Sequence, residues 1–262
     1  MTPQPDLQIE DLSVRYLNED GSYKHAVRDF CLNLYPGEIV SIVGPSGCGK
    51  TTVLRAILGE VEYKGRCELS AARQTKLCYL EQSPALLPWR TVLENACLGQ
   101  EIRGLMSSSS ITRVKELLHD LGLGGETMSV FPNELSSGMR QRVAIARALE
   151  SSPEVMLCDE PFSAIDFINR LNLNKIFKQR CSSRVAVLLV THNIDEAIFL
   201  SSRVYVMSGG ARSPGYVSAV IEPGFSGWID DPVVMRELPE FERCFKDIWS
   251  AMEVGAENDE IV

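Results

Sequence analysis

Apolar residues along the chain fall into short runs that alternate with helical segments. Residues 7–16 alternate between apolar and polar positions and predict a β-strand, and 26–34 predict a second strand beyond a polar turn. Further short apolar runs predict strands at 38–43, 77–81, 155–158, 185–190, 203–207 and 216–221, with a helix at about 166–180. This interleaving indicates an α/β fold with a mainly parallel sheet and an antiparallel segment at the N-terminus.

Residues 84–150 interrupt the alternation, because helical segments replace strands there. The helical pattern covers about 91–98, 111–121 and 139–149. A last amphipathic stretch, 232–252, is interrupted by Pro239. We therefore expect four parts: the first part of the core at 1–83, an inserted helical subdomain at 84–150, the second part of the core at 151–222 and a C-terminal extension at 223–262.

The composition, with 45% hydrophobic and 23% charged residues, is that of an ordinary globular protein. The net charge of −9 argues against a broad nucleic-acid-binding surface, which would normally be basic. The eight cysteines form no Cys-x-x-Cys pair, and their spread favours a reducing cytosol over a disulfide framework. We find no signal-peptide pattern and no apolar stretch near the ~18 residues of a membrane span, so we expect a soluble chain.

Residues 44–52 read GPSGCGKTT and lie between an apolar strand and a helix. Such a glycine-rich turn lets backbone N–H groups face a polyphosphate, and the helix N-terminus adds its dipole. Lys50 supplies a positive charge for the β- and γ-phosphates, and the Thr51 hydroxyl is placed to bind Mg²⁺. The alternative is a chance glycine-rich turn. The predicted nucleotide-binding residues of this loop are Gly44, Ser46, Gly47, Cys48, Gly49, Lys50, Thr51 and Thr52.

Two acidic residues follow the apolar run 155–158. A buried strand that ends in carboxylates delivers them to the edge of the sheet where ligands bind in α/β folds. Asp159 is the expected Mg²⁺ ligand, and Glu160 is expected to polarise the water that attacks the γ-phosphate. The alternative is a solvated Asp-Glu turn before Pro161.

Gln82 and His192 also follow predicted strands. Taken alone, such a glutamine is usually a surface residue, and such a histidine is more often structural than catalytic. The strand at 185–190 should lie beside the strand that carries Asp159, so His192 could reach a γ-phosphate as a hydrogen-bond donor.

Residues 134–142 read ELSSGMRQR and lead directly into a helix. Ser136, Ser137 and Gly138 at this helix start form a second possible anion-binding terminus. The alternative is an ordinary serine N-cap.

Together these residues resemble the nucleotide-binding subunits of ATP-binding cassette (ABC) transporters, a family with a P-loop NTPase core. The motifs occur in the family's order over residues 7 to about 222. The loop at 44–52 matches Walker A, Gln82 the Q-loop, 135–142 the signature, 155–160 Walker B, 163–166 the D-loop and His192 the switch histidine. The resemblance implies that ATP and Mg²⁺ are bound, with Tyr16 stacking on adenine, Gln82 contacting Mg²⁺ and Asp166 lying near the nucleotide.

The resemblance also implies a working unit. Family members form head-to-tail dimers in which ATP lies between Walker A of one copy and the signature of the other. Ser137 departs from the usual Leu-Ser-Gly-Gly signature, because it adds a side chain where the family has glycine.

The segments 82–96 and 191–208 are similar to the bacterial nitrate, sulfonate and taurine importer ATPases. This implies an ATPase at the cytoplasmic face of the membrane that serves a permease and, indirectly, a periplasmic solute-binding protein. The solute would be a small anion or an organosulfur or nitrogen compound. The alternatives are a non-transport ABC ATPase acting on nucleic acid or the ribosome, and a P-loop small-molecule kinase.

Residues 84–90 read PALLPWR. Two prolines disfavour regular structure, so Leu86, Leu87 and Trp89 are expected on a rigid loop. This loop either offers an apolar docking surface to a helix of the membrane subunit or packs its apolar side chains inside the helical block.

Overall fold

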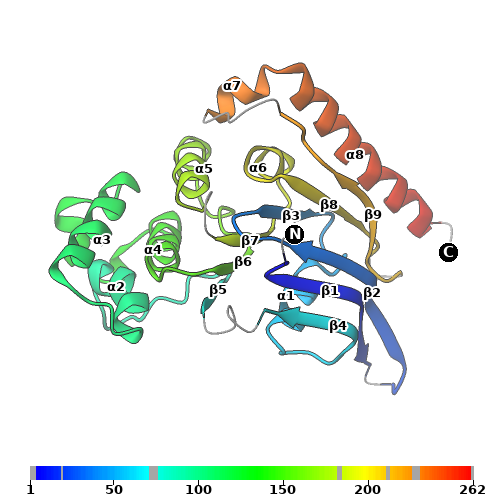
Figure 1. Cartoon of the computed structure of the whole chain (residues 1–262), viewed down its shortest axis with the longest axis horizontal. Coiled ribbons are helices and arrows are strands. Elements are labelled where there is room, and N and C mark those ends of the chain that lie inside the picture. Colours follow the sequence, from blue (N-terminus) through cyan, green and yellow to red (C-terminus); the bar gives the residue numbers. More distant parts are fainter. Residues whose placement is uncertain are drawn as a thin grey trace.

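The computed structural model describes residues 4–18, 20–70, 76–181, 185–210, 213–225 and 231–260. Its strands are β1 (Leu7–Leu17), β2 (Tyr23–Leu34), β3 (Ile39–Val43), β4 (Tyr63–Leu69), β5 (Leu77–Leu80), β6 (Val155–Asp159), β7 (Ala186–Val190), β8 (Arg203–Ser208) and β9 (Tyr216–Ile221). Its α-helices are α1 (Lys50–Ile57), α2 (Val92–Ile102), α3 (Ser108–Asp120), α4 (Ser137–Glu150), α5 (Phe167–Cys181), α6 (Ile194–Leu200), α7 (Pro232–Arg236) and α8 (Pro239–Glu260). Figure 1 shows their arrangement.

A six-stranded sheet in the order β5-β6-β7-β3-β8-β9 forms the centre of the molecule. All neighbouring strands in it are parallel except β8 and β9, which are antiparallel. A smaller antiparallel sheet, β2-β1-β4, lies beside it. The predicted α/β fold with a mainly parallel sheet and an N-terminal antiparallel segment is therefore confirmed.

The central strands β3, β6 and β7 are buried along their whole length and mostly apolar, because both faces of the large sheet are covered. In β6, Val155 and Leu157 belong to the core between the two sheets and α1, whereas Met156 and Cys158 belong to the core on the helical side. Neighbouring residues of a strand point to opposite faces, so a continuous apolar run is what two cores require. Helices α5, α6 and α8 cover the second face (Figure 1).

Helices α2, α3 and α4 lie together beyond the β5 edge of the sheet (Figure 1). The four serines at 107–110 cap the start of α3. Ser107 is the N-cap of the helix and exchanges hydrogen bonds with Ser110 in a capping box. Thr91 and Glu94 form the equivalent capping box of α2. These caps explain why both helices begin where they do.

The amphipathic C-terminal stretch forms the two helices α7 and α8, which are separated next to Pro239 as the sequence predicts. Strand β4 and helix α6 were not predicted. Five of the seven residues of β4 are exposed, so the strand carries little apolar pattern and owes its place to pairing with β1. Within the described residues, no helix is long and apolar enough to cross a membrane.

Candidate functional site

The register of the central sheet aligns the carboxyl ends of three strands. Ile42 of β3 pairs with Val190 of β7, and Val190 pairs with Asp159 of β6. The segments that follow these strands therefore leave the sheet side by side: the glycine-rich loop after β3, Glu160 after β6 and His192 after β7. Ligands of open α/β sheets bind outside this edge.

Glycine is required at several positions of the loop between β3 and α1. Gly49 precedes α1 as its N-cap with φ 100°, and a Cβ there would lie 2.6 Å from Val27. A Cβ on Gly44 would lie 2.3 Å from the carbonyl oxygen of Met207. Gly47 has φ 84° and open space around it. The loop thus packs tightly against β2 and β8 on one side and is open on the other.

Lys50 lies within the loop rather than in solvent, and the residue is 7% exposed. Its ammonium donates hydrogen bonds of 2.8 Å to the carbonyl oxygens of both Gly44 and Pro45. These bonds fix the only lysine of the loop at its centre.

Cys48 is fully buried and packs in the core between the two sheets, and burial raises the pKa of its thiol. Its side chain therefore faces away from the open side of the loop. The backbone N–H of Cys48 donates to the carbonyl oxygen of Pro45 at 3.4 Å, and Cys48 is not among the residues that line the pocket beside the loop.

A pocket of about 620 Å³ opens beside the loop. Its size lies within the usual range for small-molecule sites. Most of its lining was singled out from the sequence: Tyr16, Ser46, Gly47, Gly49, Lys50, Thr51, Thr52, Gln82, Glu160 and His192. The fold brings these residues together from five separate segments of the chain.

The remaining lining includes Lys24 and His25, which the sequence reasoning missed because they follow a polar turn. Both lie on β2, and Lys24 is directly opposite Tyr16 of β1. Tyr16 is 37% exposed, so its ring is accessible at the mouth of the pocket. The alternation of β2 could have shown that Lys24 shares a face with its cross-strand neighbour Tyr16.

Three oxygen-bearing side chains of this region, those of Thr51, Asp159 and Gln82, fit a magnesium ion. Asp159 is 5% exposed, and burial raises the pKa of its carboxyl, while a hydrogen bond with Thr51 acts in the opposite direction. Gln82 donates a hydrogen bond to Glu160, the residue that follows Asp159. Hydroxyl, carboxylate and amide oxygens are the hard ligands that Mg²⁺ prefers, so this donor set fits the ion.

Glu160 is held by its neighbours from two strand ends. His192 Nδ1 lies 3.1 Å and Gln82 Nε2 lies 3.4 Å from the same oxygen, Oε2 of Glu160. The backbone N–H of Glu160 donates to Val190 at 2.8 Å, and its φ of 46° is in the left-handed region. A non-glycine residue there costs about 1–3 kcal/mol, and such strain is concentrated at functional sites.

The loop that carries His192 is fixed by a buried acidic residue that the sequence reasoning did not identify. Thr191 donates 2.8 Å to Glu196, and the backbone N–H of Asn193 donates 3.0 Å to Thr191. Glu196 is 4% exposed and lies 3.6 Å from Arg170, and burial raises the pKa of its carboxyl. The sequence signal was an acidic residue directly before the apolar run 197–200.

The predicted signature residues lie at the start of α4. Ser136 is the N-cap and accepts a hydrogen bond of 3.2 Å from the backbone N–H of Met139. Ser137 is exposed, and a Cβ on Gly138 would lie 3.1 Å from the carbonyl oxygen of Ala164. A side chain at 138 would thus contact the 163–166 loop tightly, whereas position 137 is open to solvent.

Asp166 lies directly before α5 and accepts hydrogen bonds from the backbone and side chain of Asn169, at 3.2 and 2.7 Å. These bonds lower the pKa of its carboxyl. Among the described residues that line the pocket beside the glycine-rich loop, none belongs to 136–138 or is Asp166. One copy of the chain therefore does not bring these residues to the loop.

Comparison with known proteins agrees with this geometry. Residues 27–163 match the family described as "ABC transporter". The chain is 40% identical over 216 residues to the aliphatic sulfonates import ATP-binding protein SsuB 2 of Pseudomonas syringae pv. tomato, covering 80% of this chain and 87% of that protein. It is 37% identical over 213 residues to the taurine import ATP-binding protein TauB of Escherichia coli, covering 79% and 82% respectively.

Two solved structures of the bacterial ABC transporter cassette MJ0796 have the same fold. Its dimeric structure superposes with a TM-score of 0.68 at 29% identity, covering 84% of this chain and 100% of that one. A second dimeric structure, a post-hydrolysis state bound to ADP and Pi, gives the same values. The family match, the relatives and the shared fold agree, and the chain belongs to the ABC transporter family as an ATP-binding subunit whose ATP hydrolysis is coupled to transport.

Proposed function

We propose that the chain is the ATP-hydrolysing subunit of an importer for a small anion, most specifically a sulfonate or a related organosulfur compound. The observation that carries the proposal is the convergence of Lys50, Glu160 and His192 on one pocket at the carboxyl edge of the sheet. The solute class is supported by the names of relatives, which are sulfonate and taurine import proteins. The site of action is the cytoplasmic face of the membrane, on a separate permease supplied by a periplasmic solute-binding protein.

In this proposal the residues of the site divide the binding of ATP and the metal ion among them. Tyr16 stacks on the adenine, and Lys24 lies across from it on the neighbouring strand. The N–H groups of residues 46–51 and the Lys50 ammonium bind the phosphates. Thr51, Asp159 and Gln82 hold the metal ion, which when bound neutralises charge on the phosphate oxygens.

Glu160 is the proposed general base. It accepts the proton of the water that attacks the γ-phosphate, and its strained backbone aims the carboxylate toward the pocket. His192 and Gln82 contact the same oxygen of Glu160, so they orient the carboxylate and leave its second oxygen for the water. A positioned base is worth about 10²–10⁴-fold in rate.

A second copy completes the site in this proposal. Ser136 to Gly138 form a helix N-terminus with two exposed serines, and none of the three residues lines the nucleotide pocket of its own chain. In a head-to-tail dimer this terminus would face the γ-phosphate held by the partner. ATP would then close the dimer, and hydrolysis would reopen it.

The proposed permease contact is the loop at 84–90. Trp89 is 70% exposed, so the alternative in which this tryptophan packs inside the helical block is wrong. Leu86 packs partly against the helical-side core, and Leu87 is half-buried. An exposed tryptophan on a proline-restrained loop is suited to receive a short helix of a membrane protein.

The test is reconstitution with a candidate permease from the same organism, in vesicles that contain the solute-binding protein. We expect ATP-dependent uptake of an alkanesulfonate or taurine, and solute-stimulated ATPase activity. Trp89→Ala should lower both by about 30-fold, the scale of an interface residue worth 2 kcal/mol, without changing ATP hydrolysis by the isolated subunit. Trp249→Ala, at a tryptophan that is 50% exposed on α8, is the control and should leave uptake unchanged.

Uptake of none of these solutes by an assembled complex would contradict the proposed solute class. Full coupling in the Trp89→Ala variant would place the permease contact elsewhere. Specific ATPase stimulation by nucleic acid or ribosomes, with no permease bound, would favour the non-transport alternative.

A further inference from the structure

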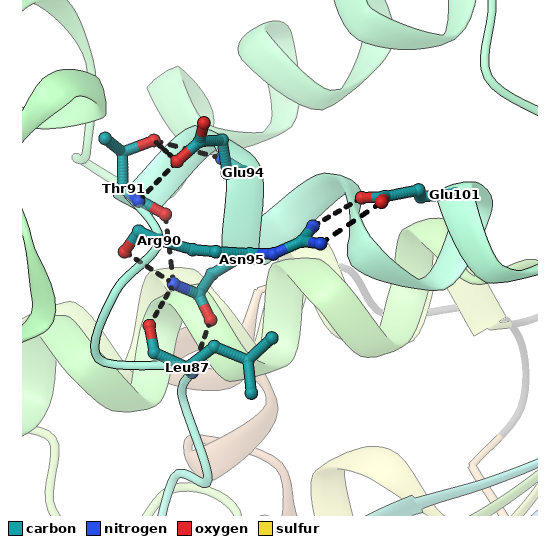
Figure 2. A network of polar contacts seen from close by, with 6 residues as sticks. All are labelled: Leu87, Arg90, Thr91, Glu94, Asn95 and Glu101. Carbon is teal, nitrogen blue, oxygen red and sulfur yellow. Dashed lines mark hydrogen bonds and ion pairs between the residues drawn. The ribbon is translucent and has the colours of Figure 1, made fainter.

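The loop at 84–91 is held by a buried amide that lies outside the nucleotide pocket. Asn95 of α2 is fully buried. Its side-chain oxygen accepts a hydrogen bond of 2.8 Å from the backbone N–H of Leu87. Its amino group donates to the carbonyl oxygens of Leu87, Arg90 and Thr91, at 3.1, 2.9 and 3.0 Å (Figure 2).

These bonds replace regular secondary structure. The two prolines, Pro84 and Pro88, have no N–H to donate, so neither position can supply a donor to a strand ladder. Buried or half-buried backbone groups must nevertheless find partners. One side chain of α2 supplies partners for the backbone at three positions of the loop, and it does so from within the helix that the loop precedes.

Two further contacts hold the same loop. Arg90 forms an ion pair with two hydrogen bonds to Glu101, which lies near the C-terminal end of α2 (Figure 2). Arg147 of α4 donates a hydrogen bond of 2.7 Å to the carbonyl oxygen of Ala85, and burial lowers the pKa of its guanidinium. The beginning of the loop is thus tied to the helix that carries the signature, and its end to α2.

Trp89 lies between these anchors and is 70% exposed. Ordering a mobile loop costs entropy at the moment of docking, and a loop whose backbone is already fixed avoids that part of the cost. We propose that Asn95, assisted by Arg147, is a positioning residue for coupling: it holds the 84–91 loop in the conformation that presents Trp89 to the permease. This inference rests on the proposed importer function and adds to it the residues that preform the docking surface.

Asn95 contacts neither the glycine-rich loop nor Glu160, so its role can be separated from ATP binding. Asn95→Asp is nearly isosteric and can still accept from the Leu87 N–H. It cannot donate to the three carbonyl oxygens, and it places a carboxylate among them. Asn174→Asp makes the same chemical change at a position of α5 that is 3% exposed, away from the loop, and is the matched control.

The first measurement uses the isolated full chain and needs no permease. The chain has three tryptophans. In a background of Trp228→Phe and Trp249→Phe, the emission anisotropy of Trp89 reports the mobility of the loop. We expect Asn95→Asp to lower this anisotropy, Arg147→Gln to lower it less, and Asn174→Asp to leave it unchanged. ATP KM should stay the same in all three variants.

The second measurement uses the complex reconstituted with permease and solute-binding protein, with all tryptophans present. Asn95→Asp should reduce solute-stimulated ATPase activity and uptake by about tenfold, because Trp89 would no longer be held in its docking position. Arg147→Gln should reduce them less, and Asn174→Asp should not. The unstimulated ATPase activity should be the same in each case.

Unchanged Trp89 anisotropy in Asn95→Asp would overturn the proposal, as would a mobile Trp89 with full coupling. If Asn95→Asp does not fold, Arg147→Gln tests the proposal by the same two measurements, Trp89 anisotropy and coupling. Arg147 is only half-buried, so we expect this variant to fold. If the wild-type complex shows no uptake, the proposed function fails. A drop in Trp89 anisotropy in Asn95→Asp would then still establish that Asn95 positions the loop.

Discussion

Two glycine-containing loops, at 44–50 and 135–138, each lead directly into the N-terminus of a helix, and their surroundings differ. The loop at 44–50 lies at the carboxyl edge of the central sheet, where β2, β6 and β7 surround it and Tyr16 closes the pocket. The loop at 135–138 lies at the start of α4, where Ser136 and Ser137 are exposed. Both offer free N–H groups to an anion.

This difference indicates which of the two loops can bind a phosphate within a single copy of the chain. Lys50 gives the first loop a fixed positive charge, held by two carbonyl oxygens. The second loop has only its hydroxyl and amide donors, and its glycine is used for packing on Ala164. We therefore expect the first loop to determine ATP affinity and chemistry, and the second to add a contact from a partner copy.

The first prediction concerns the chemistry that only the first site contains. Glu160→Gln should keep ATP binding but lower hydrolysis by about 10²–10⁴-fold, because the amide cannot accept the proton of the attacking water. ATPase assays check the rate, and size exclusion with ATP should show an accumulated dimer. Glu81→Gln changes an exposed neighbouring acid and should be silent. Normal turnover in Glu160→Gln would mean that another group activates the water.

The second prediction removes the charge that distinguishes the two loops. Lys50→Ala should lower kcat/KM for ATP by about 10²–10³-fold, the cost of losing a preorganised donor to a developing charge. Arg55→Ala removes an exposed cation from the same helix and should have little effect. Nucleotide titration with turnover measurements separates binding from chemistry. Near-normal turnover of Lys50→Ala would contradict the phosphate-binding role of this loop.

The third prediction tests the wall of the pocket. Tyr16→Ala should raise the KM for ATP by the equivalent of about 1–3 kcal/mol, the value of base–aromatic stacking, and Tyr16→Trp should be tolerated. Tyr23 is 55% exposed on the paired strand and outside the pocket lining, so Tyr23→Ala is the matched control. Equal loss in Tyr16→Ala and Tyr16→Trp would identify Tyr16 as a packing residue.

The smallest effect is expected at the second loop. Ser137→Gly restores the residue that the family usually has there, and we expect a small gain in ATPase activity at protein concentrations that allow dimers. A loss would show that the hydroxyl donates to a phosphate. Ser108→Gly alters the equivalent first residue of α3 and controls for helix stability. No change in Ser137→Gly would mean that position 137 faces away from the nucleotide.

The sequence by itself determined the parts of the protein that depend on local order along the chain. The apolar runs of β3, β6 and β7 require burial on both faces, which predicts a covered parallel sheet. The glycines at 44–49 and the acids after β6 are contiguous motifs whose chemistry follows from their spacing. The three α-helices of the 84–150 region could be predicted from their apolar periodicity, and the break before α8 could be predicted from Pro239.

Only the tertiary structure decided which neighbours these motifs have. Whether Cys48 faces a phosphate or the core, and whether Trp89 is buried or exposed, depends on packing between distant segments. Strand β4 carries almost no apolar pattern and is defined by its pairing with β1. Asn95 bonds to a loop only a few residues away in the sequence, but these bonds could not be predicted from it. An asparagine in a helix is normally solvated, and its contacts here depend on the irregular backbone conformation of the 84–91 loop.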